Sequence, residues 1–470
     1  MAKAQFGMIG LGTMGRNFLL NIAEKGISGI GYNRDNDKLE LLIKDGEGFP
    51  VTGVSAIEDL VSGLESPRRI MLLVPAGAAV DSVINDLLPY LEPGDLLIDG
   101  GNSHFPDTER RQAMLLEKGI AFLGVGVSGG EEGARHGASI MVGGSASVYD
   151  HVRPIFEAAS AKVNGEPCAA LVGNGSAGHF VKMVHNGIEY GMMQLLAETY
   201  DFMHRVLNLD YRQMSDTFAE WNEGELNSFL VEITATVLRK IEPGSNKHLV
   251  EIILDTAGQK GTGKWTSQAA MDLGIAIPTI DSAVSMRQIS ALKKLRSEIS
   301  TIYPPSTADG SPPETLHKLK NALYAAFIVT YAQGLALLQS ASTEKEYGLN
   351  LAEVAKIWRG GCIIRSALLE KMRQAFSDSP DLPNLVLDHD FAKILTANLS
   401  DWQSVIGEYN SASIPSLCFS STLNYFNSIR SERLPANVIQ AQRDFFGAHT
   451  YQRLDRDGSF HTPDWEMAEN

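Results

Sequence analysis

Cysteine is scarce in this chain, and its three residues lie far apart. Cys168, Cys362 and Cys418 have none of the close spacings by which cysteines bind a metal ion. Isolated thiols of this kind are typical of buried residues in a reducing compartment. We therefore expect a cytoplasmic protein without a metal site.

We expect neither a secretory leader nor a membrane-spanning segment. The first apolar residues are soon interrupted by glycines, and no apolar stretch approaches the length that crosses a membrane.

Positive charge is also scarce, because 40 Lys and Arg stand against 56 Asp and Glu for a net charge of −16. This balance argues against nucleic acid and anionic membranes as partners, whereas the binding of an anionic small molecule depends on local charge.

The expected secondary structure changes character along the 470 residues. Up to residue 176, short buried strands alternate with helical patterns, which predicts a doubly wound, Rossmann-like α/β domain over residues 1–176. Long helical patterns then predict an all-α domain over residues 177–434. Residues 435–470 form a tail rich in Asp, Arg, Gly and aromatics, which we expect to pack against other protein surface rather than to be free in solvent. After the first two strands, further strands are expected at Ile70–Val74, Leu96–Asp99, Ile120–Val125, Ser139–Val142 and Ala169–Val172.

The first residues have the pattern of a dinucleotide-binding unit. A strand is expected over residues 4–9, a helix over Met14–Lys25 and a second strand over Ile27–Tyr32. The turn between the first strand and the helix is a G-x-G-x-x-G sequence, which predicts that a pyrophosphate reaches the helix N-terminus. A purely structural glycine turn is the weaker alternative. The residues of the turn are Gly10, Leu11, Gly12, Thr13, Met14 and Gly15.

The end of the second strand indicates which dinucleotide binds. NAD sites usually have Asp or Glu there for the ribose hydroxyls, but this chain has Asn33 followed by Arg34. Asn33 leaves room for a 2′-phosphate and Arg34 can pair with it, which favours NADP. Asp35 weakens this interpretation, because it could repel the phosphate or occupy the arginine.

Four polar residues lie at helical spacing just after the α/β domain. Lys182, His185, Asn186 and Glu189 fall at i, i+3, i+4 and i+7, on one face of a helix whose other faces are largely apolar. Buried polar groups need partners, so the stripe is either an internal hydrogen-bonded network or an active-site face. In the second case Lys182 carries the proton.

Three loops are candidates for holding ligands. Asp99–Ser103 and the glycine-rich Val127–Gly137 both follow expected strands, and the second loop suits a carboxylate because it combines backbone N–H groups with a hydroxyl. The segment Asp255–Trp265 nearly matches a triphosphate-binding loop, but a tryptophan stands where the Mg²⁺-binding hydroxyl must be. It therefore suits a phosphate on a small substrate.

Together these motifs resemble the family of decarboxylating 6-phosphogluconate dehydrogenases along essentially the whole chain. The resemblance implies oxidation of 6-phospho-D-gluconate to D-ribulose 5-phosphate and CO₂ with reduction of NADP, a step of the pentose phosphate pathway. It also implies a homodimer whose active sites are shared between subunits. The matching segments are Gly10–Gly15, Asn33–Arg34, Ile98–Asn102, Val127–Gly137, Lys182–Tyr190, Lys260–Trp265 and Arg443–Thr450.

The resemblance further implies a role for each matching residue. Lys182 and Glu189 correspond to the family's base and acid. Cofactor contacts would come from the glycine turn, Asn33, Arg34, Asp35, Val74, Pro75, Ala76 and Asn102. The substrate carboxylate region would meet Ser128, Gly129 and Gly130, and its hydroxyls Asn102, His185 and Asn186. Its phosphate would meet Tyr190, Lys260, Thr262 and Arg287, joined by Arg443 and His449 from the second subunit.

Two departures from the family concern only the cofactor. Pro75 stands where the family commonly has Lys, and Asp35 replaces the usual Thr. Both leave the preference between NADP and NAD open.

Two rival functions remain. A β-hydroxyacid dehydrogenase for a smaller acid without phosphate would not need the basic loop at Lys260–Lys264. A non-catalytic nucleotide-binding protein would not need Lys182, Asn186 and Glu189.

Overall fold

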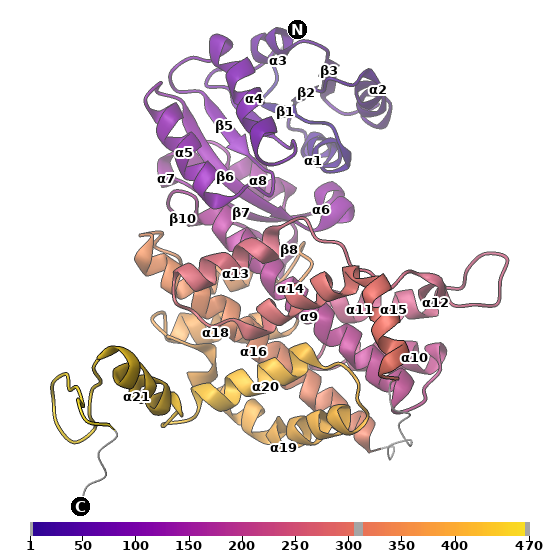
Figure 1. The fold of residues 1–470 in the computed structure, drawn as a ribbon. Helices are drawn as coiled ribbons and strands as arrows, with labels where there is room; N and C mark the ends of the chain where they lie inside the picture. The colour runs from indigo at the N-terminus through magenta and orange to yellow at the C-terminus, as the bar shows by residue number, and fades with distance from the viewer. Residues whose placement is uncertain (1–2, 305–313, 466–470) are drawn as a thin grey trace, which may run out of the picture. The chain divides into compact units, whose positions relative to one another are not determined.

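An eight-stranded sheet is the framework of the N-terminal part of this computed structural model, which describes residues 3–304 and 314–465 (Figure 1). The strand order is β10-β7-β6-β5-β4-β1-β2-β3, and only β7 runs antiparallel to a neighbour, β6. The strands are β1 Phe6–Ile9, β2 Gly29–Tyr32, β3 Val51–Val54, β4 Arg69–Leu72, β5 Leu96–Asp99, β6 Ala121–Ser128, β7 Ser139–Gly143 and β10 Ala169–Gly173. A separate hairpin joins β8 Lys162–Val163 to β9 Glu166–Pro167.

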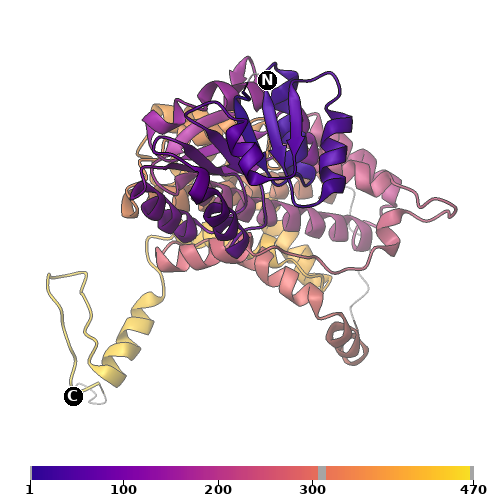
Figure 2. The same ribbon diagram turned by 90° about the horizontal axis from the view of Figure 1, so that it is seen from above.

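Helices cover both faces of this sheet (Figure 1 and Figure 2). Successive strand residues point to opposite faces, so Leu96 and Ile98 of β5 belong to one apolar cluster and Leu97 to another. The predicted doubly wound α/β fold is thereby confirmed. The helices are α1 Thr13–Glu24, α2 Asn36–Asp45, α3 Ile57–Ser62, α4 Ala78–Leu87, α5 Phe105–Leu116, α6 Gly130–His136, α7 Ala146–Tyr149 and α8 Arg153–Ala159, with a 3₁₀ turn at Leu88–Tyr90.

Two expectations for this part need correction. The glycine-rich segment Val127–Gly137 is not an open loop, because β6 continues to Ser128 and α6 begins at Gly130. The edge strand β3 was missed, because it is short, half-exposed and interrupted by Gly53, so it lacks the apolar run of a buried strand.

The helical part begins with α9, Ala177–Arg205, which packs against β6 and β7. Residues of the long α16, Thr315–Glu344, contact α9 on one side and α19, His389–Ser411, on the other (Figure 1). The remaining helices are α10 Tyr211–Asn222, α11 Phe229–Arg239, α12 Leu249–Ile252, α13 Thr262–Asp272, α14 Pro278–Ala291, α15 Lys293–Ile302, α17 Leu351–Trp358, α18 Leu368–Asp378, α20 Leu417–Ile429 and α21 Ala436–Gly447, with a 3₁₀ turn at Leu385–Leu387.

Helix α16 contradicts the expectation that no apolar stretch approaches membrane-spanning length. Among the described residues it is the one helix long and apolar enough to cross a membrane. However, 89% of its most apolar window is buried inside the protein, so these side chains already contact other helices. A buried core helix has the same composition, and α16 by itself is weak evidence for a membrane span.

The chain divides into two compact units, Met1–Thr422 and Leu423–Asn470. In the second unit, the chain after α21 folds back on the buried carboxylate of Asp444, which accepts hydrogen bonds from Thr450 N–H, Thr462 N–H and the Trp465 indole. Burial alone would raise the pKa of Asp444, but these bonds and His461 hold it at about 2. The predicted domain borders at residues 176 and 434 stay predictions.

Close packing of α9 on the sheet generates a stability prediction. A Cβ on Gly178 would lie 2.2 Å from the carbonyl oxygen of Gly124 and 2.5 Å from that of Met141. We expect Gly178→Ala to lower the free energy of unfolding by about 1–3 kcal/mol, because the backbone must move. Gly407→Ala in α19 is the control, since nothing lies within 4 Å, and it should be stabilising by up to ~1 kcal/mol. Denaturant unfolding measures both variants, and equal stabilities would contradict the packing argument.

Candidate active site

Of the three glycines in the turn at the start of α1, the first and last have no space for a Cβ, whereas the middle one has open space beside it. A Cβ on Gly10 would lie 2.4 Å from the carbonyl oxygen of Leu73, and one on Gly15 would lie 1.9 Å from that of Gly10. Gly10 also has φ of +94°, which favours glycine. Around Gly12, which directly precedes α1, no heavy atom lies within 4 Å of such a Cβ. The space beside the helix N-terminus therefore fits a pyrophosphate.

A cleft beside this turn continues past the ends of β1 and β2. Asn33 shapes its wall, because its Oδ1 accepts a hydrogen bond of 3.0 Å from Leu11 N–H. The cleft is lined by Gly10, Asn33, Arg34, Asp35, Val74 and Pro75 from the predicted cofactor contacts, and by Lys38, Ser82 and Asp86, which were not predicted.

The charges in this cleft are already paired. Arg34 lies 3.2 Å from Asp86, and Lys38 lies 2.8 Å from Asp35. The hydrogen bond from Lys38 lowers the pKa of Asp35, so this carboxylate is ionised. Asp35 therefore pairs with Lys38, and the carboxylate that occupies Arg34 is Asp86.

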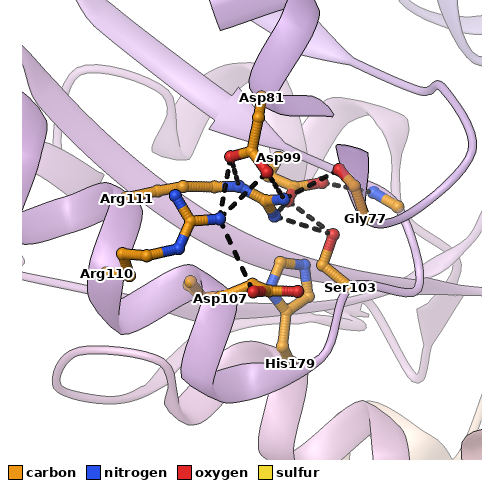
Figure 3. Close-up of polar contacts among 10 residues, drawn as sticks. Gly77, Asp81, Asp99, Ser103, Asp107, Arg110, Arg111 and His179 are labelled. Atoms are coloured by element: carbon orange, nitrogen blue, oxygen red, sulfur yellow. Dashed lines mark hydrogen bonds and ion pairs between the residues drawn. The ribbon is translucent and has the colours of Figure 1, made fainter. Parts of the chain in front are cut away.

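A buried arginine holds two ligand-facing loops in place (Figure 3). Arg111 of α5 is fully buried, and its Nη1 lies 3.2 Å from Asp99 Oδ2 at the end of β5. Its Nε donates a 2.9 Å hydrogen bond to Asp81 of α4, and its Nη2 donates one of 3.0 Å to the carbonyl oxygen of Gly77. Gly77 directly follows the predicted cofactor segment 74–76. One cation therefore fixes this segment and the loop after β5.

Asn102 lies in the second of these loops. Asp99 accepts hydrogen bonds from Gly101 N–H at 3.1 Å and from the Ser103 hydroxyl at 2.6 Å. The backbone is thus held on both sides of Asn102, while its side chain is exposed. An exposed amide on a fixed backbone can meet both a cofactor and a substrate.

The predicted polar stripe lies on α9 beside the end of β6. Lys182 is 6% exposed and His185 is fully buried. His185 Nε2 lies 3.3 Å from the Ser128 hydroxyl, and its Nδ1 lies 3.1 Å from Asn186 Oδ1 and 3.9 Å from Glu189 Oε2. The structure therefore brings these five residues together. The contacts of His185 agree with an internal polar network, and an active-site role for the stripe stays a prediction.

Burial perturbs the titrating groups of this stripe. It lowers the pKa of the Lys182 ammonium, and the Glu189 carboxylate partly opposes the shift. It raises the pKa of Glu189, against the influence of Lys182 and Arg287. Burial and the positive charge of Lys182 hold the pKa of His185 well below its usual value, so its imidazole is neutral. An amine and a carboxyl shifted toward each other are suited to exchange protons near neutral pH.

Residues far along the chain complete this face, and no motif in the sequence predicted them. A Cβ on Gly129 would lie 2.4 Å from the carbonyl oxygen of Gly361, which also accepts a 2.9 Å hydrogen bond from Ser139 N–H. The Trp358 ring packs edge-on against His185 at 5.6 Å. The segment after α17 therefore sets the position of the Ser128–Gly130 turn. The only sequence signal was the close pair of glycines at residues 360 and 361.

Of the predicted phosphate residues, Arg287 and Tyr190 are in direct contact. The Arg287 guanidinium lies 3.5 Å from the centre of the Tyr190 ring, and its Nη1 donates a 2.7 Å hydrogen bond to the carbonyl oxygen of Gly258. A Cβ on Gly263 of α13 would lie 2.6 Å from the same ring, so α13 packs closely beside it. Thr262 is buried at the start of α13, and Lys260, two residues earlier, is exposed. Arg443 and His449 are exposed and belong to the C-terminal unit.

One aromatic contact links this phosphate region to the loop that carries Asn102. The His104 imidazole stacks on the Trp265 indole, with ring centres 4.6 Å apart and planes 24° apart. His104 directly precedes α5, and Trp265 lies in the first turn of α13. Burial lowers the pKa of His104.

This stack predicts a pH-dependent change in tryptophan fluorescence. Burial disfavours the charged imidazolium, so His104 should gain its proton only below the ordinary histidine value of ~6.5. Protonated His104 should then quench Trp265. The measurement is a fluorescence titration of the wild type and of His104→Gln, which should lose the step. A midpoint at or above ~6.5, or a step that persists in His104→Gln, would contradict the stack.

Comparison with known proteins agrees with this geometry. Residues 5–173 match the family model of the NAD binding domain of 6-phosphogluconate dehydrogenase, and residues 178–465 match that of its C-terminal domain. A Bacillus subtilis relative named 6-phosphogluconate dehydrogenase, NADP(+)-dependent, decarboxylating is 49% identical, with coverage of 98% of this chain and 99% of the relative. The Saccharomyces cerevisiae relative named 6-phosphogluconate dehydrogenase, decarboxylating 1 is 48% identical, with coverage of 98% and 95%.

A solved structure extends the likeness to three dimensions. Plasmodium falciparum 6-phosphogluconate dehydrogenase, determined in its apo form and in complexes with NADP+ and with 6-phosphogluconate, superposes with a TM-score of 0.95. Its sequence is 44% identical, and the match covers 98% of this chain and 100% of that chain. The resemblance read from the motifs is confirmed, and the chain belongs to the 6-phosphogluconate dehydrogenase family.

Proposed function

We propose that this protein oxidatively decarboxylates 6-phospho-D-gluconate to D-ribulose 5-phosphate and CO₂ with reduction of NADP. The observation that carries the proposal is the buried pair on α9, where Lys182 has a lowered pKa and Glu189 a raised one. The names of the relatives and the ligands of the Plasmodium falciparum structure support the same reaction and cofactor.

Lys182 acts first as a general base. As a neutral amine it accepts the proton of the C3 hydroxyl while C3 loses a hydride, and a C3 ketone results. The nicotinamide of bound NADP supplies the hydride acceptor. A free lysine titrates near ~10.4, whereas an effective base at neutral pH titrates nearer ~7–8. The desolvation of Lys182 by α9 and β6 lowers its pKa in the required direction.

Lys182 and Glu189 then serve the decarboxylation. The C1–C2 bond breaks, its electron pair moves toward the C3 carbonyl, and the Lys182 ammonium gives its proton to the oxygen that becomes an enol. Glu189 donates a proton to the carbon that carried the carboxylate, while Lys182 takes back the enol proton. The step needs no metal ion, because the C3 ketone accepts the electrons.

The remaining residues orient the substrate in this proposal. Ser128, Gly129 and Gly130 face its carboxylate, and Asn102, His185 and Asn186 its hydroxyls. Tyr190, Lys260, Thr262 and Arg287 face its phosphate. A β-hydroxyacid dehydrogenase for a smaller acid is the second candidate. The Arg287 guanidinium held over Tyr190 argues against it, because an acid without phosphate gives this cation no anionic partner.

We further propose a cytoplasmic homodimer in which each C-terminal unit completes the neighbour's site. Arg443 and His449 are exposed, and the exposed apolar residues Phe445 and Phe446 lie between them. Such a surface suits a protein partner, and the Arg443 guanidinium and the His449 imidazole offer N–H donors to a phosphate. Three free, buried thiols are in line with a reducing compartment.

Replacement of the proposed base tests the function. We expect Lys182→Met to lower kcat by ~10²- to 10⁴-fold, the contribution of a general base, while NADPH binding stays within about two-fold. The exposed Lys118→Met is the control and should keep full activity. The measurement is reduced-nicotinamide absorbance with 6-phosphogluconate. Near-normal turnover in Lys182→Met would refute this residue as the base, and no turnover in the wild type would refute the reaction.

A mixed dimer tests the shared site. Lys182→Met and Arg443→Ala should each be inactive, and the two are unfolded and refolded together. Random pairing makes about half of the dimers mixed, and one site of each mixed dimer then has both residues intact, so about a quarter of wild-type activity should return. Mass spectrometry confirms the mixed dimers. If they form and no activity returns, each C-terminal unit serves its own chain and the proposal fails.

A further inference from the structure

Two carboxylates hold both cations of the cofactor cleft. Arg34 follows β2 and pairs with Asp86 of α4, and Lys38 in the first turn of α2 pairs with Asp35. All four residues line the same cleft as Asn33. With two positive and two negative side chains, these four groups have no net charge.

The two ion pairs differ in origin. Asp35 and Lys38 are three residues apart, so they meet on one helical turn wherever α2 forms. Arg34 and Asp86 are 52 residues apart, so their contact depends on the fold bringing α4 beside the end of β2. The Arg34–Asp86 contact therefore joins two elements that line the cleft, the end of β2 and α4, at the place where a cofactor's 2′-substituent is expected.

Asp86 has opposite consequences for the two dinucleotides. A 2′-phosphate must take the Arg34 guanidinium from Asp86, and the released carboxylate then remains near the phosphate as a like charge. The side chains of Arg34 and Asp86 are 68% and 43% exposed, and exposed ion pairs are weak, so a 2′-phosphate can displace Asp86. The affinity gained for the phosphate is reduced, however, because the carboxylate stays nearby. A ribose with a free 2′-hydroxyl leaves the pair intact and can donate a hydrogen bond to a carboxylate.

We propose that Asp86 is a specificity-determining residue that competes with the 2′-phosphate for Arg34 and so reduces the preference for NADP over NAD. The inference rests on the proposed function only in that the cleft receives the adenosine half of the cofactor. Repulsion of the 2′-phosphate and occupation of the arginine, which the sequence suggested for Asp35, are thereby assigned to Asp86.

The test uses two fragments of the cofactor, adenosine 2′,5′-bisphosphate and adenosine 5′-monophosphate, titrated by calorimetry. Asp86→Asn should bind the bisphosphate about 3- to 10-fold more tightly than the wild type, because Arg34 is freed and a like charge is removed. Its affinity for the monophosphate should change less than about two-fold. Asp37→Asn is the control, since it makes the same charge change on α2 outside the cleft lining, and both affinities should stay within about two-fold.

A double-mutant cycle separates competition for Arg34 from a general charge effect. In an Arg34→Ala background, Asp86→Asn should tighten bisphosphate binding by a smaller factor than in the intact protein, because only the removal of the like charge remains. In the intact enzyme, the ratio of kcat/KM for NADP to that for NAD should rise by the same factor as the bisphosphate affinity. Circular dichroism melting confirms that each variant is folded.

The remaining outcomes distinguish a failure of this inference from a failure of the proposed function. If Asp86→Asn leaves bisphosphate affinity unchanged, or tightens both fragments equally, Asp86 does not read the 2′-substituent. If the full effect of Asp86→Asn on bisphosphate affinity persists in the Arg34→Ala background, Asp86 does not act through Arg34. If the fragments bind but 6-phosphogluconate is not oxidised, the proposed reaction fails and this inference stands. If neither fragment binds any variant, the inference fails together with the cofactor assignment.

Discussion

Burial of one amine on α9 is the constraint on which the rest of the site depends. Lys182 loses its hydration because α9 packs directly on the sheet, and Gly126 makes this possible, since a Cβ there would lie 2.4 Å from Cβ of Lys182. Gly178, one turn earlier, contacts backbone on β6 and β7. Desolvation disfavours the ammonium form, so the close packing lowers the pKa of Lys182. The proposed role of Lys182 as a base therefore depends on how closely α9 approaches the sheet.

The groups around this amine are held by contacts between distant parts of the chain. Through Asp99, Asp81 and Gly77, Arg111 fixes the loop after β5 and the loop that precedes α4. On the other side, the Thr266 hydroxyl of α13 donates a 2.9 Å hydrogen bond to the carbonyl oxygen of Met183, next to Lys182. The predicted phosphate region is thereby tied to α9 itself. Such support would hold the groups of the proposed reaction in fixed positions, which proximity catalysis requires.

The sequence predicted what depends on short spacing and missed what depends on the fold. The glycine turn and the α9 stripe follow from a few consecutive residues, and both formed as expected. The Arg34–Asp86 pair and the His104–Trp265 stack join residues 52 and 161 positions apart, which no local pattern encodes. The prediction of a loop over Val127–Gly137 was wrong for a different reason. Its glycines suggested a ligand-binding loop, whereas Gly129, at φ +125°, allows a sharp turn directly into α6.

The most direct test of this account is a titration of Lys182 itself. Lysine side chains labelled with ¹⁵N are followed by NMR from neutral to alkaline pH, and Lys182→Met assigns the resonance. The account predicts that Lys182 releases its proton below the ordinary lysine value of ~10.4, and at still lower pH in Glu189→Gln, where the carboxylate no longer favours the ammonium. A pKa at or above ~10.4 in the folded protein would contradict the claim that burial turns Lys182 into a base.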